Sequence, residues 1–187
     1  THAVEAYIGH SNTPHTIDMS EKAVKLIFDN LETAYNDGAN IQARENMLKG
    51  SFYAGVAFTR AYVGYVHAIA HNLGGLYGVP HGLANAIILP YVLEAYGSSA
   101  YKPLAKLADI AGITEGLTTE SEKAIKFIET VKQMNKNMDI PDKFDCIKEE
   151  DLPLLIKRAI KEGNPLYPVP KIFNYNDFEN VIRKMMK

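Results

Sequence analysis

The sequence predicts an all-α fold, in which residues 1–187 form a single multi-helix domain. Apolar residues recur at three- and four-residue steps through most of the chain, which is the period of a helix with one buried face. Helix-capping motifs precede two of these runs. No convincing run of strands and no internal repeat is present. We therefore expect about eight helices.

Three helices are expected in the first third of the chain. An apolar helical face follows directly after Thr1 and His2, over residues 3–8. Asp18 to Glu21 has the form of a capping box, so both acids are interpreted as caps of a helix that ends at Asp37-Gly38. The next helix should run from near Asn40 through Phe58, with small residues that permit close approach of a neighbouring helix.

The middle of the chain predicts two buried helices. Tyr62 to Leu76 is apolar on nearly every side and is interrupted mainly by two histidines and an asparagine. A turn at Gly78-Val79-Pro80 separates it from a second apolar helix, from about His81 through Leu89. Pro90 is expected to bend or end that helix.

The last part of the chain alternates shorter helices with polar loops. Pro103 to Ala111 predicts a helix with proline in its first turn. Thr119 to Glu122 is a second capping box and should open another helix. Further helices are expected over residues 149–161 and 176–187, and the three prolines between 164 and 170 predict an extended loop.

Composition excludes several classes of function. With 47% hydrophobic and 22% charged residues, the chain has the composition of an ordinary globular protein. Its net charge of −2 gives no general electrostatic reason to bind nucleic acid or an anionic membrane. No apolar run approaches the roughly 18 residues of a membrane span. The balance of acidic and basic residues therefore points to a small-molecule or protein partner, or to none.

A cytoplasmic location is predicted from two features. The N-terminal residues lack the basic and apolar regions of a secretory signal. The single cysteine, Cys146, cannot form an internal disulfide, which fits a reducing compartment. Nothing near Cys146 in the sequence would lower its pKa, so we interpret it as a bystander rather than a nucleophile.

Three of the six histidines fall in the least polar part of the chain, namely His67, His71 and His81. His67 and His71 are four residues apart, so they share one helix face, and the turn before His81 can fold it back to the same place. Imidazole suits zinc and ferrous iron. We favour a metal or catalytic site. The alternative is that these are core histidines whose ring nitrogens form hydrogen bonds within the protein. His10 and His15 lie in a polar stretch and are assigned no role.

This segment resembles the signature of the iron-containing (group III) alcohol dehydrogenases. The matching residues are Gly64 to His67, Ala70 to Gly74 and Pro80 to Asn85, and residues 1–7 resemble the family's Asp-x-x-Thr-His-Ala-x-Glu segment. The resemblance is strongest up to Pro90. It implies the C-terminal, helical, metal-binding domain of the dehydroquinate synthase-like and iron-containing alcohol dehydrogenase fold.

The resemblance also implies a ligand set. In this family one divalent metal, Fe²⁺ or sometimes Zn²⁺, is held by one aspartate and three histidines, which correspond here to His2, His67 and His81. His71 corresponds to a non-ligand histidine near the nicotinamide and substrate, a candidate for proton relay or positioning. Phe58 and Val63 match positions that line the substrate pocket, although both also fit as ordinary core residues.

The implied activity is that of an NAD(P)-dependent alcohol dehydrogenase, which interconverts a primary alcohol or diol with its aldehyde by hydride transfer while the metal polarises the substrate oxygen. Two parts of this pattern are missing. The aspartate ligand would stand four residues before His2, ahead of Thr1. The N-terminal α/β domain that binds NAD or NADP is absent from this chain, and Gly74 to Gly78 is a poor candidate for a phosphate loop. We therefore expect the chain alone to be inactive or nearly so.

Two alternatives remain open. The chain could be a domain of a zinc-type glycerol dehydrogenase or of a dehydroquinate-synthase-like enzyme. It could also be a non-catalytic helical module for dimerisation or metal binding, in which case changing His67 and His81 to alanine would remove no activity from the full-length protein. The family resemblance implies a homodimer or larger assembly.

Overall fold

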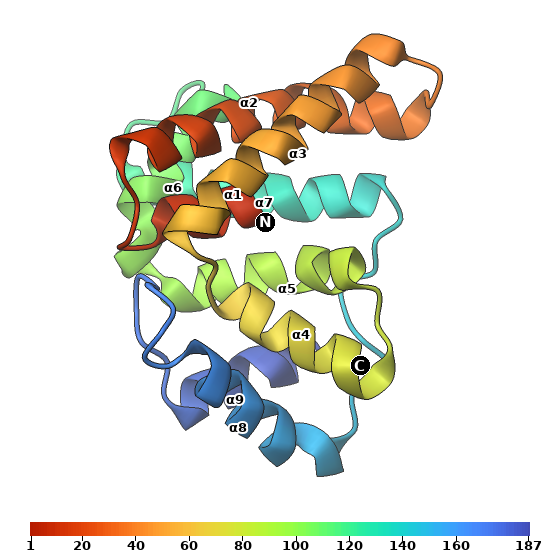
Figure 1. Ribbon diagram of the computed structural model, residues 1–187, viewed down its shortest axis with the longest axis vertical. Helices are drawn as coiled ribbons and strands as arrows, with labels where there is room; N and C mark the ends of the chain where they lie inside the picture. Colours follow the sequence, from red (N-terminus) through yellow and green to blue (C-terminus); the bar gives the residue numbers. More distant parts are fainter.

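The computed structural model describes all residues, 1–187, and confirms the all-α class (Figure 1). The only β pairing is an isolated bridge between Phe144 and Met186. None of the helices combines the length and apolar character that a bilayer span requires. The helices are α1 (His2–Ile8), α2 (Pro14–Asn36), α3 (Ile41–Ala61), α4 (Tyr65–Tyr77), α5 (His81–Tyr96), α6 (Ser98–Ala111), α7 (Glu120–Asn137), a 3-10 turn (Glu149–Asp151), α8 (Leu152–Gly163) and α9 (Tyr175–Lys184). The structure has nine α-helices, one more than the expected count of about eight, and each of them overlaps a segment that the sequence predicted to be helical.

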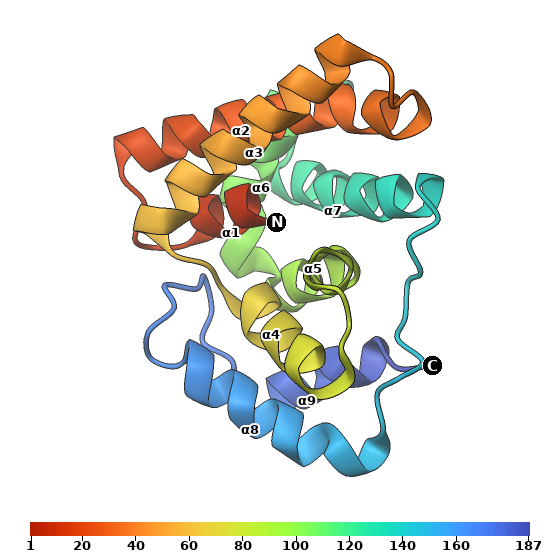
Figure 2. The same cartoon turned by 45° about the vertical axis from the view of Figure 1, so that its right-hand side comes forward.

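The helices stack from one end of the molecule to the other. Long helices α2 and α3 form an antiparallel hairpin at the top of Figure 1, and α1 packs against both. Helix α6 packs on α7, and α4 packs on α5 near the middle. Helices α8 and α9 lie at the opposite end, where α8 contacts α4 and α9 contacts α5 (Figure 2). Helices α1, α4 and α5 thus occupy the interior of the stack.

Tyr65, at the start of α4, joins the middle of the stack to the C-terminal end. It is fully buried, and its ring centroid lies 4.8 Å from those of both Phe173 and Phe178. Its hydroxyl lies 2.5 Å from Asn164 Oδ1 and accepts a hydrogen bond from the Phe173 backbone N–H at 3.2 Å. The polar end of this buried ring is therefore satisfied by the loop that follows α8.

The start of α2 differs from the prediction. The helix begins at Pro14, and Thr13 caps it by accepting a hydrogen bond from the Thr16 backbone N–H at 3.2 Å. Proline suits this first position because its missing N–H would be unpaired there anyway. The interpretation of Asp18 and Glu21 as caps was wrong: Asp18 pairs with Lys22 within the helix, and Glu21 accepts a hydrogen bond from the Tyr7 hydroxyl. His15 lies on the exposed side of α2, not in a loop.

Pro90 does not end α5, which continues to Tyr96. Proline removes a backbone donor, which would leave the carbonyl of Ala86 without its helical partner. The side chain of Asn135 in α7 donates to that carbonyl at 2.7 Å. Pro103 likewise lies inside α6, which begins at Ser98 rather than at the proline. The capping box at Thr119 is confirmed, with Glu122 as its partner.

Candidate metal centre

Three histidines from three helices converge on one place. His2 is the first residue of α1, His67 lies in α4, and His81 is the first residue of α5. Each offers a ring nitrogen, and the three nitrogens lie within 4.8 Å of one another. The ring centroids of His67 and His2 are 4.5 Å apart, and those of His67 and His81 are 5.3 Å apart.

The turn between α4 and α5 brings His81 back over His67. Helix α4 ends at Gly78, whose φ of 69° is in the left-handed region that glycine adopts without steric cost. Val79 and Pro80 complete the turn, and Pro80 stands immediately before the first residue of α5. The Gly-Val-Pro segment thus places the two histidines together, as its sequence predicted.

His67 is held by a buried carboxylate, Glu5 of α1. Glu5 Oε2 lies 2.5 Å from His67 Nδ1, and Glu5 Oε1 accepts a hydrogen bond from the Val66 backbone N–H at 2.8 Å. The other ring nitrogen of His67, Nε2, is buried and has no hydrogen-bond partner in the protein. A buried nitrogen without a partner is unusual and is explained if it binds an ion. These residues therefore fit a metal.

The surroundings favour neutral imidazoles at two of the three positions. Burial, with a further contribution from the nearby His67, lowers the pKa of His2 to about 4. Burial and the nearby His67 and His71 also lower the pKa of His81. Both side chains are therefore neutral at pH 7, the state in which a histidine binds a metal.

His71 lies beside this group but is not one of the three converging residues. Its ring stacks on His81 with centroids 5.4 Å apart, and nearly half of its side chain is exposed. Its Nδ1 lies 2.7 Å from Glu162 Oε1 of α8, which also accepts a hydrogen bond from the Tyr167 hydroxyl at 2.8 Å. The i, i+4 spacing from His67 therefore brings His71 close to the centre without including it in the converging set.

The two expected pocket residues lie in different surroundings. The Phe58 ring stacks on His2, with centroids 4.0 Å apart. Val63, in the loop before α4, lines a small crevice together with Glu5, Gly64 and Tyr96. Phe58 therefore contacts the candidate ligand His2. Val63 shares its crevice with Glu5, the carboxylate that contacts the candidate ligand His67.

Glu5 is the functional candidate that sequence reasoning missed. It stands three residues after His2, a spacing that places both side chains on one face of a helix. That signal is weak, because glutamate at such a spacing is common on exposed helices. The contact with His67 links residues 62 positions apart in the chain and follows only from the packing of α1 against the start of α4.

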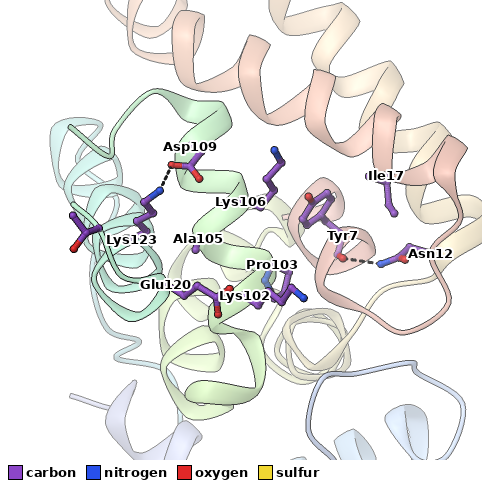
Figure 3. A pocket seen from close by; sticks show the side chains of 11 residues that line it. Tyr7, Asn12, Ile17, Lys102, Pro103, Ala105, Lys106, Asp109, Glu120 and Lys123 are labelled. Carbon is purple, nitrogen blue, oxygen red and sulfur yellow. Dashed lines mark hydrogen bonds and ion pairs between the residues drawn. The ribbon is translucent and has the colours of Figure 1, made fainter. Parts of the chain in front are cut away.

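An open cleft of about 540 Å³ lies elsewhere, between α1, the start of α2 and helices α6 and α7 (Figure 3). Its charged side chains are of both signs, and Lys123 pairs with Asp109 at 2.8 Å. No histidine lines it. This cleft is therefore distinct from the candidate metal centre.

Comparison with known proteins agrees with this geometry. Residues 1–186 match the model described as the Fe-containing alcohol dehydrogenase family, C-terminal. The chain belongs to this family. The resemblance stated from the sequence motifs is thereby confirmed.

Relatives and solved structures extend the match over nearly the whole chain. The 1,3-propanediol dehydrogenase of Klebsiella pneumoniae is 40% identical over 188 residues, covering 98% of this chain and 48% of that protein. The NAD-dependent methanol dehydrogenase of Bacillus methanolicus is 32% identical over 188 residues, covering 100% of this chain and 49% of its own length. A crystal structure of 1,3-propanediol oxidoreductase superposes with a TM-score of 0.94 at 37% identity, covering 99% and 49% of the two chains. The chain spans about half the length of the curated relatives it matches.

Proposed function

We propose that this chain is the helical, metal-binding half of an NAD(P)-dependent alcohol dehydrogenase, which interconverts a primary alcohol or diol with its aldehyde. The observations that carry the proposal are the convergence of His2, His67 and His81 and the buried Nε2 of His67, which has no hydrogen-bond partner. Membership of the Fe-containing family supports the reaction class. Relatives named for 1,3-propanediol support a diol or short primary alcohol as substrate.

Three imidazoles suit Fe²⁺ or Zn²⁺, and the family name favours iron. When bound, the metal supplies a Lewis acid that polarises the substrate oxygen. The histidines from α1, α4 and α5 would hold it. The ring of Phe58 covers one face of His2 and gives the site an apolar wall, against which the carbon chain of an alcohol packs.

His71 is proposed to relay the proton of the alcohol to or from water and to position substrate and nicotinamide. Its Nδ1 is engaged by Glu162, so its Nε2 is the nitrogen available to a ligand. Nearly half of its side chain is exposed, so a proton held at Nε2 exchanges directly with water. Residues outside this chain would bind most of the NAD or NADP.

The proposal is tested on a full-length protein that carries this chain. With Fe²⁺ we expect alcohol-dependent reduction of NAD⁺ or NADP⁺, followed at 340 nm, and loss of at least about 100-fold in the His67→Ala/His81→Ala double variant. The isolated 187 residues should bind metal and show almost no turnover. Undiminished activity of the double variant would favour the non-catalytic module. Activity confined to glycerol with Zn²⁺ would favour the glycerol dehydrogenase alternative.

A cytoplasmic homodimer or larger assembly of the full-length protein completes the proposal. Helix α3 exposes a row of large apolar side chains, Ile41, Leu48 and Phe52, each at least 66% exposed. Apolar surface of this kind commonly marks a contact with another protein. Light scattering on the full-length protein tests it: we expect a multiple of the subunit mass, reduced by Leu48→Glu.

A further inference from the structure

We propose that Glu5 is a positioning residue that fixes the ring of His67 in the form that can bind a metal. In this form the proton is on Nδ1, and the lone pair of Nε2 is free to bind a metal. The inference rests on the metal centre proposed above. It assigns a role to a residue outside the ligand set.

Both oxygens of Glu5 are engaged within the protein interior. The side chains of Glu5 and His67 are only 1% and 3% exposed. Oε1 accepts from the Val66 N–H and Oε2 meets His67 Nδ1. Because a carboxylate only accepts hydrogen bonds, Nδ1 is the donor in this pair. Nε2 of a neutral His67 then carries no proton, and a ligand can use its lone pair.

The space for this carboxylate is provided by Gly64. A Cβ atom at position 64 would lie 2.8 Å from Glu5 Oε1, closer than real Cβ contacts allow. The backbone at Gly64 has a φ of −136°, which any residue can adopt, so it is space and not conformation that requires glycine here. The absence of a side chain at Gly64, three residues before His67, therefore leaves the space that the Glu5 carboxylate occupies.

Helix α1 thus contributes twice to the centre. It supplies His2 as a candidate ligand and, on the same face three residues later, the carboxylate that orients a second ligand. A carboxylate behind a ligating histidine also raises the basicity of the ring and brings negative charge near the cation. Loss of such a partner typically weakens metal affinity by about 10–100-fold.

Glutamine in place of Glu5 should reverse the tautomer. Its amide has one oxygen, and the buried Val66 N–H needs an acceptor. With the oxygen on Val66, the amide NH₂ faces His67 Nδ1 and donates to it, which moves the ring proton to Nε2. Glu162→Gln is a matched control, because it makes the same chemical change at Nδ1 of His71, which is not in the converging set.

The test uses the 187-residue chain and two measurements at fixed pH. Ring ¹⁵N NMR shifts, assigned with a His67→Gln variant, report the tautomer of His67 without metal. Competition with a chromophoric chelator reports the affinity for Zn²⁺. We expect the Nδ1–H form in the native chain, the Nε2–H form and about 10–100-fold weaker binding in Glu5→Gln, and unchanged Zn²⁺ affinity in Glu162→Gln.

The outcomes separate this inference from the proposed function. If the native chain binds no Zn²⁺, the metal centre fails, while the tautomer still reports on Glu5. If the native chain binds Zn²⁺ and Glu5→Gln binds equally well, the role of Glu5 is overturned. Should Glu5→Gln fail to fold, the native tautomer alone decides: a proton on Nε2 of His67 in the metal-free chain rejects the proposal.

Discussion

Gly64 is the position where the candidate centre is most sensitive to the addition of one carbon. We predict that Gly64→Ala lowers the free energy of unfolding by about 1–3 kcal/mol, since the new Cβ overlaps Glu5 Oε1 and the buried carboxylate must move. Urea unfolding measures this. Gly75→Ala, within α4, is the control: its Cβ meets nothing within 4 Å, and alanine should raise stability by about 0.5–1 kcal/mol. Equal effects of the two changes would contradict the prediction.

Cys146 should react slowly with alkylating reagents. Burial, reinforced by the charge of Asp145, raises the pKa of its thiol, so the thiolate fraction at pH 7.5 is below that of an unperturbed cysteine. We expect the rate of reaction with iodoacetamide to be lower than that of glutathione and to rise with pH to beyond the ordinary thiol range. A rate that levels off at neutral pH would show a reactive thiol instead.

The residues of the centre could be predicted only in part. Helical spacing placed His67 on one face with His71. In the structure, however, the residues whose ring nitrogens come together with that of His67 are His2 and His81. Only the family resemblance singled out His2, because nothing in a histidine next to the N-terminal residue indicates a partner 65 positions away. The role of Glu5 depends on the same long-range packing.

The start of α2 can be tested by comparing Thr13, which caps the helix in the structure, with Asp18, which the sequence predicted as a cap. We predict that Thr13→Ala costs about 0.5–2 kcal/mol of stability, because the Thr16 backbone N–H loses its acceptor. Asp18→Ala should lower the free energy of unfolding by only a few tenths of a kcal/mol, because Asp18 forms only an exposed i, i+4 pair with Lys22. Chemical denaturation of both variants measures the difference. A larger loss from Asp18→Ala would restore Asp18 as the cap.

The elements themselves followed closely from periodicity, since apolar residues at helical steps need one buried face whatever the fold. Errors arose where a distant group changed a local rule. Pro90 would end an isolated helix, but Asn135 from α7 satisfies the carbonyl of Ala86 and α5 continues. Such a donor belongs to the tertiary structure, so the residues around Pro90 do not reveal it.

Cohesion of the whole molecule depends on Tyr65, which connects α4 to the loop between α8 and α9. We predict that Tyr65→Phe lowers stability by about 1–3 kcal/mol, because the buried Phe173 N–H loses its acceptor and Asn164 loses a partner. In a hydrogen-exchange experiment, the backbone amides of residues 164–182 should lose more protection than those of α2 and α3. Uniform loss of protection would contradict this placement.

The three candidate ligands lie on helices that only the folded chain brings together, and their affinity for a cation is therefore also a contribution to folding. An ion that binds this arrangement and not the unfolded chain stabilises it by about 2.7 kcal/mol at a concentration 100 times its dissociation constant. The melting temperature of the chain should consequently rise with added Zn²⁺ and fall again with a chelator. When metal is scarce, a larger fraction of the chain is unfolded and open to proteases. The first effect of scarce metal would then be a shorter lifetime of the polypeptide.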